Sequence, residues 1–127
     1  MDMQTVLTLL EAEVLSRLVT HDYTFARGAA ADLMSDVLAY APTNSVLLTG
    51  LINPQVVRTA EMAGILAIVI VRGKRPPAET IRLAEEVGIP LLSTRYTMYE
   101  ACGLLYHAGL AGPGPCDVYD LPERAAE

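Results

Sequence analysis

The stretch NPQVVRTAEMAGILAIVIV (Asn53–Val71) carries a pattern that returns 24 residues later in PAETIRLAEEVGIPLLST (Pro77–Thr94). Each copy predicts a helix, a glycine that ends it and a short apolar strand. In the first copy, Asn53 is suited to cap the helix, and Pro54 fits the first turn, where its missing N–H costs nothing. Gly64 supplies the left-handed residue that ends the helix. The β-branched run after it is typical of a strand buried on both faces.

The second copy repeats this construction, and a third helix follows it. Pro76 and Pro77 open the second helix, Gly88 ends it, and the letters LLS form the next strand. Thr97 and Glu100 then stand three residues apart, the spacing of a capping box, in which each satisfies a backbone donor at a helix start. We expect Gly109 to end this third helix.

Ser45–Thr49 (SVLLT) predicts the strand that precedes the first copy. Strands and helices then alternate with short connections, which indicates right-handed βαβ winding. The predicted fold class is therefore α/β, a small three-layer domain with a mainly parallel central sheet and helices on both faces. We expect one domain over residues 1–110 and a Gly/Pro-rich, acidic C-terminal arm over residues 111–127.

The N-terminal third has a weaker pattern. Residues 3–11 predict a short helix, and the segment AEVLSRLV after them either continues it or becomes an edge strand. We predict a strand at Tyr23–Arg27, followed by small residues that allow close packing. A helix is expected from Asp32 to Ala41, because Pro42 stops it.

Composition excludes several classes of function. The chain has 127 residues, a net charge of −6 and a pI near 4.8, which argue against bulk binding to nucleic acid. No apolar run is long enough to cross a membrane, and the start lacks the basic region of a signal peptide. Two cysteines do not make a disulfide framework. We therefore expect a cytoplasmic protein without nucleic-acid or membrane partners.

Four segments together resemble the DRTGG domain, a small α/β module of bacteria and archaea. They are ADLMSDVLAYA, SVLLTG, AGILAIVIVRGKRP and LAEEVGIPLLSTRYTMYEACGLLY, and the resemblance spans roughly Asp32 to Gly109. The domain is also similar to the N-terminal domain of HPr kinase/phosphorylases. It occurs alone, between CBS domains of regulated pyrophosphatases and in some phosphate acetyltransferases. The resemblance implies a regulatory or assembly role without chemistry of its own. Where the family's motif has Thr-Gly-Gly, this chain has Val71, Arg72 and Gly73.

The residues themselves offer no catalytic constellation. LLTGLINP matches neither a dinucleotide-binding fingerprint nor a phosphate-binding loop. Cys102 and His107 diverge around their helix, and His21 has no second ligand at metal spacing. Cys102 is expected to be a small buried residue and Cys116 an exposed or partner-covered thiol. The acidic pairs Glu85/Glu86 and Asp32/Asp36 are interpreted as solvated helix faces or caps. We expect no cofactor, no metal and no enzymatic activity.

The carboxyl ends of the strands remain as a candidate site for an anionic ligand. In wound α/β domains, ligands bind at this edge, where helix N-termini gather. Cations, hydroxyls and small residues fall in the three connections that reach it. They are Thr49, Gly50, Asn53, Arg72, Gly73, Lys74, Ser93, Thr94 and Arg95. These residues predict a pocket for a phosphate-bearing ligand, nucleotide or carboxylate. The alternative is that the hydroxyls cap helices and the cations only offset an acidic protein.

Assembly is the second class of function. A mean hydropathy of +0.33 in a 13.7 kDa chain predicts apolar surface that suits a homodimer. Helical spacing places Leu104, Tyr106 and Leu110 away from the inward face of their helix, as candidates for that interface. The arm carries three apolar anchors of its own, Val118, Tyr119 and Leu121. They predict that the arm lies on its own or a partner subunit. A neighbouring metabolic enzyme is a further expected partner.

Overall fold

The computed structural model describes residues 1–17 and 23–116. In chain order, its helices are α1 (Met3–Leu10), α2 (Met34–Tyr40), α3 (Pro54–Ala63), α4 (Ala78–Val87) and α5 (Met98–His107). Its strands are β1 (Glu13–Val14), β2 (Arg27–Ala30), β3 (Ser45–Thr49), β4 (Ala67–Ile70) and β5 (Leu91–Ser93). The strands form one sheet in the order β1-β5-β4-β3-β2. Strands β2 to β5 are parallel and β1 is antiparallel to β5, so the α/β prediction with a mainly parallel sheet is confirmed.

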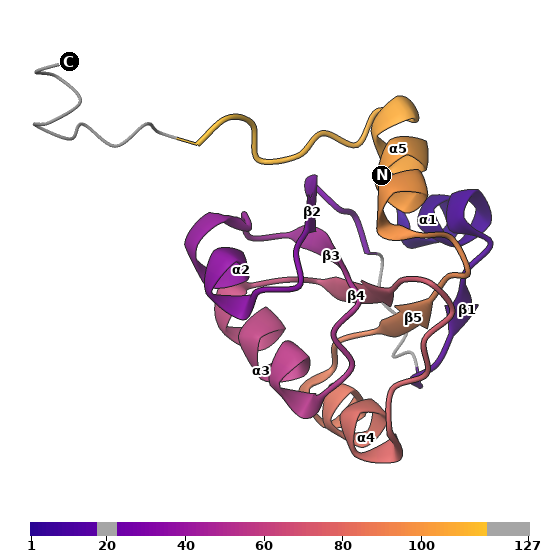
Figure 1. The fold of residues 1–127 in the computed structure, drawn as a ribbon, viewed down its shortest axis with the longest axis vertical. Coiled ribbons are helices and arrows are strands. Elements are labelled where there is room, and N and C mark those ends of the chain that lie inside the picture. Colours follow the sequence, from indigo (N-terminus) through magenta and orange to yellow (C-terminus); the bar gives the residue numbers. More distant parts are fainter. Residues whose placement is uncertain (18–22, 117–127) are drawn as a thin grey trace, which may run out of the picture.

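Helices cover both faces of the sheet (Figure 1). Because β2, β3, β4 and β5 lie side by side in sequence order, right-handed crossovers put α2, α3 and α4 on one face. The other face receives no crossover helix, and α1 and α5 cover it instead. Two apolar cores result, one on each side of the sheet. The three-layer arrangement predicted from the sequence is thus confirmed.

The repeated units form as predicted. Gly64 and Gly88 end α3 and α4 with φ of 72° and 77°, in the left-handed region that favours glycine. Asn53 occupies the N-cap position of α3, although its side chain makes no capping hydrogen bond. At α5, the Thr97 side chain accepts a hydrogen bond from the backbone N–H of Glu100.

The N-terminal third differs in part from its prediction. The predicted strand at Tyr23–Arg27 is wrong in position, because β2 begins at Arg27 and pairs with β3 through Ala30. Thr24 makes only an isolated bridge to Asp2. The small residues after Arg27 are therefore the strand itself. The segment after α1 adopts the edge-strand alternative, as β1.

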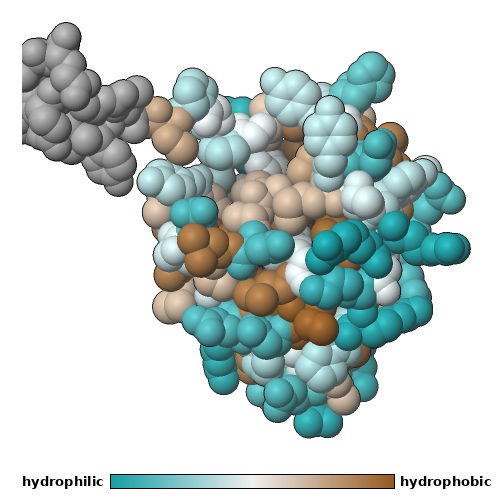
Figure 2. Space-filling view, in the orientation of Figure 1, coloured by the Kyte–Doolittle hydropathy of each residue, from teal (hydrophilic) through white to brown (hydrophobic). Residues whose placement is uncertain are grey.

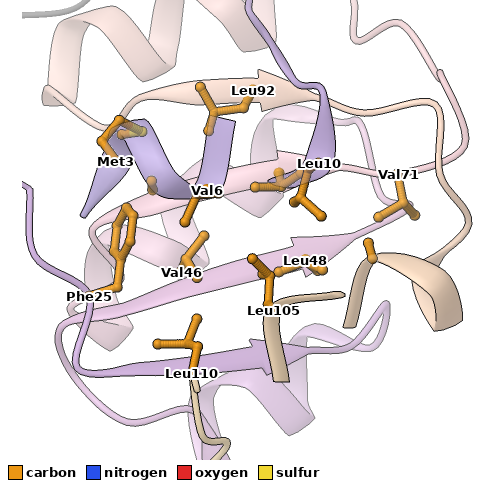
Figure 3. Packing of buried hydrophobic residues seen from close by; sticks show 13 residues of the cluster. Met3, Val6, Leu10, Phe25, Val46, Leu48, Val71, Leu92, Leu105 and Leu110 are labelled. Carbon is orange, nitrogen blue, oxygen red and sulfur yellow. The ribbon is translucent and has the colours of Figure 1, made fainter. Parts of the chain in front are cut away.

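Leu110 is a second correction. It was predicted to face outward, but only 5% of its surface is exposed, and it packs in the core beneath α1 and α5 (Figure 3). Helical spacing does not apply to it, because α5 ends at His107 and Gly109, at φ 106°, redirects the chain. Leu104 is half-buried against the same core, whereas Tyr106 is exposed as predicted.

Part of the arm is described. The carbonyl of Ala111 accepts a hydrogen bond from the backbone N–H of Gly28 at 2.9 Å, so the arm begins against β2. The predicted anchors Val118, Tyr119 and Leu121 lie outside the described residues, as does His21. No helix in residues 1–17 and 23–116 has the length and apolar character needed to cross a membrane.

Candidate functional site

The structure brings the nine predicted site residues to one edge of the sheet. Thr49, Ile70 and Ser93 stand in register at the ends of β3, β4 and β5. Backbone hydrogen bonds join the connections that follow these strands. The N–H of Arg72 donates to the carbonyl of Tyr96 at 2.8 Å, and the N–H of Gly73 donates to that of Thr94 at 2.8 Å. The β4–α4 and β5–α5 connections are therefore held together as one rigid rim.

The chain changes face at this rim. The connection after β4 leads to α4 on one side of the sheet, and the connection after β5 leads to α5 on the other (Figure 1). In open α/β sheets, successive connections that leave on opposite faces create a crevice at the carboxyl ends of the strands. Here that switch of face falls between β4 and β5, at the connections that contain Arg72–Lys74 and Arg95.

Asp32, which follows β2 in the chain, lies next to this rim, beside the end of β3. One carboxylate oxygen, Oδ1, accepts a hydrogen bond from the Thr49 hydroxyl at 3.1 Å and from the Gly50 N–H at 2.7 Å. Asp32 is exposed to solvent, as expected, but it does not cap α2, because the N-cap of that helix is Leu33 and no side chain caps it. The protein's own carboxylate takes the donors that an external anion would use there.

Other polar groups of the predicted site also have structural partners. The Thr94 hydroxyl donates to the carbonyl of Leu10 at 2.6 Å and accepts from the N–H of Tyr96 at 3.3 Å. The Lys74 ammonium donates to the carbonyl of Gly50. Neighbouring groups are equally engaged. The Tyr96 hydroxyl donates to Glu11 at 2.7 Å, and this hydrogen bond to a carboxylate raises the pKa of Tyr96.

Two guanidinium groups remain on the rim. Arg72 and Arg95 are exposed, and they flank Gly73, whose missing Cβ would lie 3.9 Å from Cγ of Arg95. The Arg72 side chain reaches over Gly50, where Nη2 lies 3.1 Å from the position a Cβ would take. Asn53 is exposed near the start of α3, and Ser93 is buried. The arrangement presents two cations and an amide to solvent.

The backbone at Arg72 is unusual. Arg72 and Gly73 have φ of 62° and 65°, and the N–H of Lys74 approaches the carbonyl of Val71 at 3.4 Å. Positive φ at both central positions is the signature of a type I′ turn, which favours glycine or asparagine. A left-handed conformation costs a residue with a Cβ about 1–2 kcal/mol. The chain thus places a strained arginine where glycine would fit.

Sequence reasoning missed one further feature, a cavity of about 400 Å³. It lies along β2, between α2, α5 and the first residues of the arm, and it includes none of the nine predicted residues. Its floor is a run of glycine and alanine, Gly28–Ala31. The signal was present in the letters RGAAA, which read as packing residues rather than as the lining of a groove. Among the described residues, no group of three or more His, Cys, Asp or Glu could hold a metal ion.

Comparison with known proteins agrees with this architecture. The family model of the DRTGG domain matches residues 5–108. The chain belongs to the DRTGG domain family. A similar solved structure is that of the CBS and DRTGG domains of the regulatory region of Clostridium perfringens pyrophosphatase, complexed with its activator, diadenosine tetraphosphate. The two chains share 15% identity at a TM-score of 0.68, over 98% of this chain and 57% of that one. At this identity the likeness shows the fold. No curated protein matches the chain.

Proposed function

We propose that this DRTGG domain is a non-catalytic regulatory module that binds a small phosphate-bearing ligand or a nucleotide at the carboxyl edge of its sheet. The observation that carries the proposal is Arg72. A residue with a Cβ held at φ 62° costs stability, and such strain concentrates at functional positions. Glycine at this position would relieve the strain. The arginine is therefore kept for its guanidinium group, at a cost in stability.

Charge placement supports an anionic ligand. The protein carries a net charge of −6, yet Arg72 and Arg95 are both exposed on one rigid rim. In the described residues, neither arginine is within ion-pair distance of a carboxylate. The ion pair found there joins Arg75 to Glu13. Guanidinium groups bind phosphate oxygens with two parallel hydrogen bonds, which a lysine cannot do. Two of them on one exposed rim suit a ligand with one or more phosphates.

The comparison supports the ligand class. The regulatory region of the Clostridium perfringens pyrophosphatase, which contains a DRTGG domain, was crystallised with a dinucleotide activator. For this chain, a nucleotide is accordingly the first ligand to test. Diadenosine tetraphosphate and ATP offer several phosphates to the two arginines, whereas acetyl phosphate offers one.

A second function is favoured by the apolar surface. Seven large hydrophobic residues of the described part are exposed: Val14, Leu33, Leu38, Tyr40, Met62, Tyr99 and Tyr106. This surface suits a dimerisation or interaction subunit of a neighbouring metabolic enzyme, with no small-molecule ligand. Absence of binding to every anion would favour this function.

The test compares Arg72→Gly with Arg95→Ala by isothermal titration calorimetry against ATP, diadenosine tetraphosphate, pyrophosphate and acetyl phosphate. Each substitution should weaken binding about tenfold or more. Arg72→Gly should also leave the melting temperature unchanged or raise it, because glycine relieves the strain. A purely structural arginine would not combine gained stability with lost binding.

The matched control is the double variant Arg58→Ala with Arg82→Ala. These exposed arginines occupy equivalent positions in the two sequence repeats, on α3 and α4, and their removal changes the net charge by the same two units. The control should retain ligand affinity within about twofold. Equal loss of binding in the control and in an Arg72→Gly, Arg95→Ala double variant would reduce the effect to net charge and contradict the proposed site.

A further inference from the structure

The cavity along β2 lies beside a sheet edge that, in the described residues, is joined only by the start of the arm, through Gly28 and Ala111. β2 is the last strand in the sheet order, and after Arg27 it contains only glycine and alanine. Natural edge strands are usually blunted by charges, proline or bulges. Here the small side chains leave a groove, whose walls include Tyr40 from α2 and Tyr106 from α5. Figure 2 shows a pale brown band of apolar residues between hydrophilic ones on this side of the molecule.

The edge also presents backbone hydrogen-bonding groups. Gly28 donates its N–H outward, to the carbonyl of Ala111. Because strand residues alternate with a period of two, Ala30 presents its N–H and C=O on the same outer edge. No described strand pairs with β2 on that side. An extended peptide could add to this edge, with its side chains in the groove, in the mode known as β-augmentation.

The chain itself supplies a peptide of suitable chemistry. Gly112, Pro113 and Cys116 line the groove, and eleven residues follow Cys116. At about 3.3 Å per residue, they span up to roughly 36 Å. In an extended conformation, Tyr119 and Leu121 would share one face. The segment is acidic, with Asp117 and Asp120, whereas β2 begins with the exposed Arg27.

We propose that the groove along β2 holds residues 117–121 of a second copy of this chain, and that the two copies exchange these segments reciprocally. The described part of the arm runs from α5 past β2 and along the groove, and it ends at Cys116, which is exposed (Figure 1). Residues 117–121 contain no glycine, the residue that most easily allows a sharp return of the chain. Reciprocal exchange gives a closed two-fold dimer.

Sedimentation velocity over a range of concentrations tests the exchange. The full chain should be a dimer. Removal of residues 117–127 should raise the dimer dissociation constant about tenfold or more, and so should Tyr106→Asp, which places a charge at the groove. The matched control is Tyr99→Asp on the same helix. Tyr99 is 86% exposed and Tyr106 72%, but only Tyr106 lines the groove, so the control should change the constant less than about twofold.

A mixing experiment separates exchange from general weakening. The truncated chain keeps an intact groove, and the Tyr106→Asp chain keeps an intact arm. An equimolar mixture should therefore form heterodimers at concentrations where each variant alone is monomeric. Circular dichroism confirms that both variants are folded. The proposal is overturned if the full chain is monomeric, if truncation leaves the dimer unchanged, or if the mixture forms no heterodimer. Truncation that lowers only the melting temperature would place the arm in its own groove and also overturn the exchange.

Discussion

The carboxyl edge of the sheet and the flank along β2 are both boundaries of one small sheet, but they are built in opposite ways. At the carboxyl edge, polar side chains converge, and most of them satisfy one another, as Asp32 does with Thr49 and Gly50. Along β2, the side chains are too small to fill the space, and a cavity of about 400 Å³ remains. Binding capacity at the first edge is thus set by the groups left over, Arg72 and Arg95. Along β2, binding capacity is set by the space that the small side chains leave empty.

The sharpest way to break this comparison is to remove Leu110, which ties the start of the arm to the core. Leu110→Ala should lower the free energy of unfolding by about 2–5 kcal/mol, the usual cost of a large-to-small change in a core. Tyr106→Ala, four residues earlier and 72% exposed, should cost far less. Urea denaturation at a fixed protein concentration measures both. Similar small losses in the two variants would show that Leu110 does not belong to the core.

At the carboxyl edge, Thr94→Val should have the next largest effect. Thr94 is 1% exposed, and its hydroxyl satisfies the carbonyl of Leu10 at the end of α1. Valine keeps the shape but leaves that carbonyl without its donor, at a cost of about 1–3 kcal/mol. Thr43→Val, at an exposed threonine, is the control in the same denaturation experiment. A Thr94→Val protein as stable as wild type would mean that solvent satisfies Leu10 and that the rim is less rigid than described.

The fold was predictable where local rules and burial agree. Gly64 and Gly88 end helices because only glycine adopts that conformation freely, and the short apolar strands after them are buried on both faces. The position of β2 was not predictable in the same way. Gly28–Ala31 carries no alternation of apolar and polar residues, so pairing with β3 creates the strand, and that is tertiary information. The prediction for Leu110 was wrong for a related reason, because helical spacing was applied beyond the end of α5.

The candidate site was predictable in its location but not in its occupancy. Strand polarity alone brings the three connections together at one edge, and the structure has them there. Which hydroxyls and amides stay available depends on contacts between residues distant in sequence. The bond from Thr94 to Leu10 spans 84 positions, and the bond from Gly50 to Asp32 spans 18. No local pattern signals such contacts, so the sequence overstated the number of free donors.

The smallest expected effect is on ligand affinity, and it concerns Asp32, the protein's own carboxylate at the carboxyl edge. Oδ1 of Asp32 lies 3.4 Å, and Nη2 of Arg72 3.1 Å, from the position that a Cβ on Gly50 would take. Asp32→Asn keeps an oxygen acceptor for Thr49 and Gly50 but removes the charge. If a phosphate-bearing ligand binds at the rim, its affinity should rise about two- to fivefold, since a carboxylate nearby repels it by roughly 0.5–1 kcal/mol in high dielectric.

That gain in affinity should shrink in high salt, because the interaction is solvent-exposed and screened. Asp36→Asn is the matched control. Asp36 is exposed in the first turn of α2, and the hydrogen bonds from Thr49 and Gly50 go to Asp32 instead. Calorimetry with ATP at low and high salt measures both variants. A gain specific to Asp32→Asn at low salt would locate the ligand beside Arg72. Equal gains in both variants would reflect net charge alone, and a loss in Asp32→Asn would mean that the carboxylate orders the rim more than it repels the ligand.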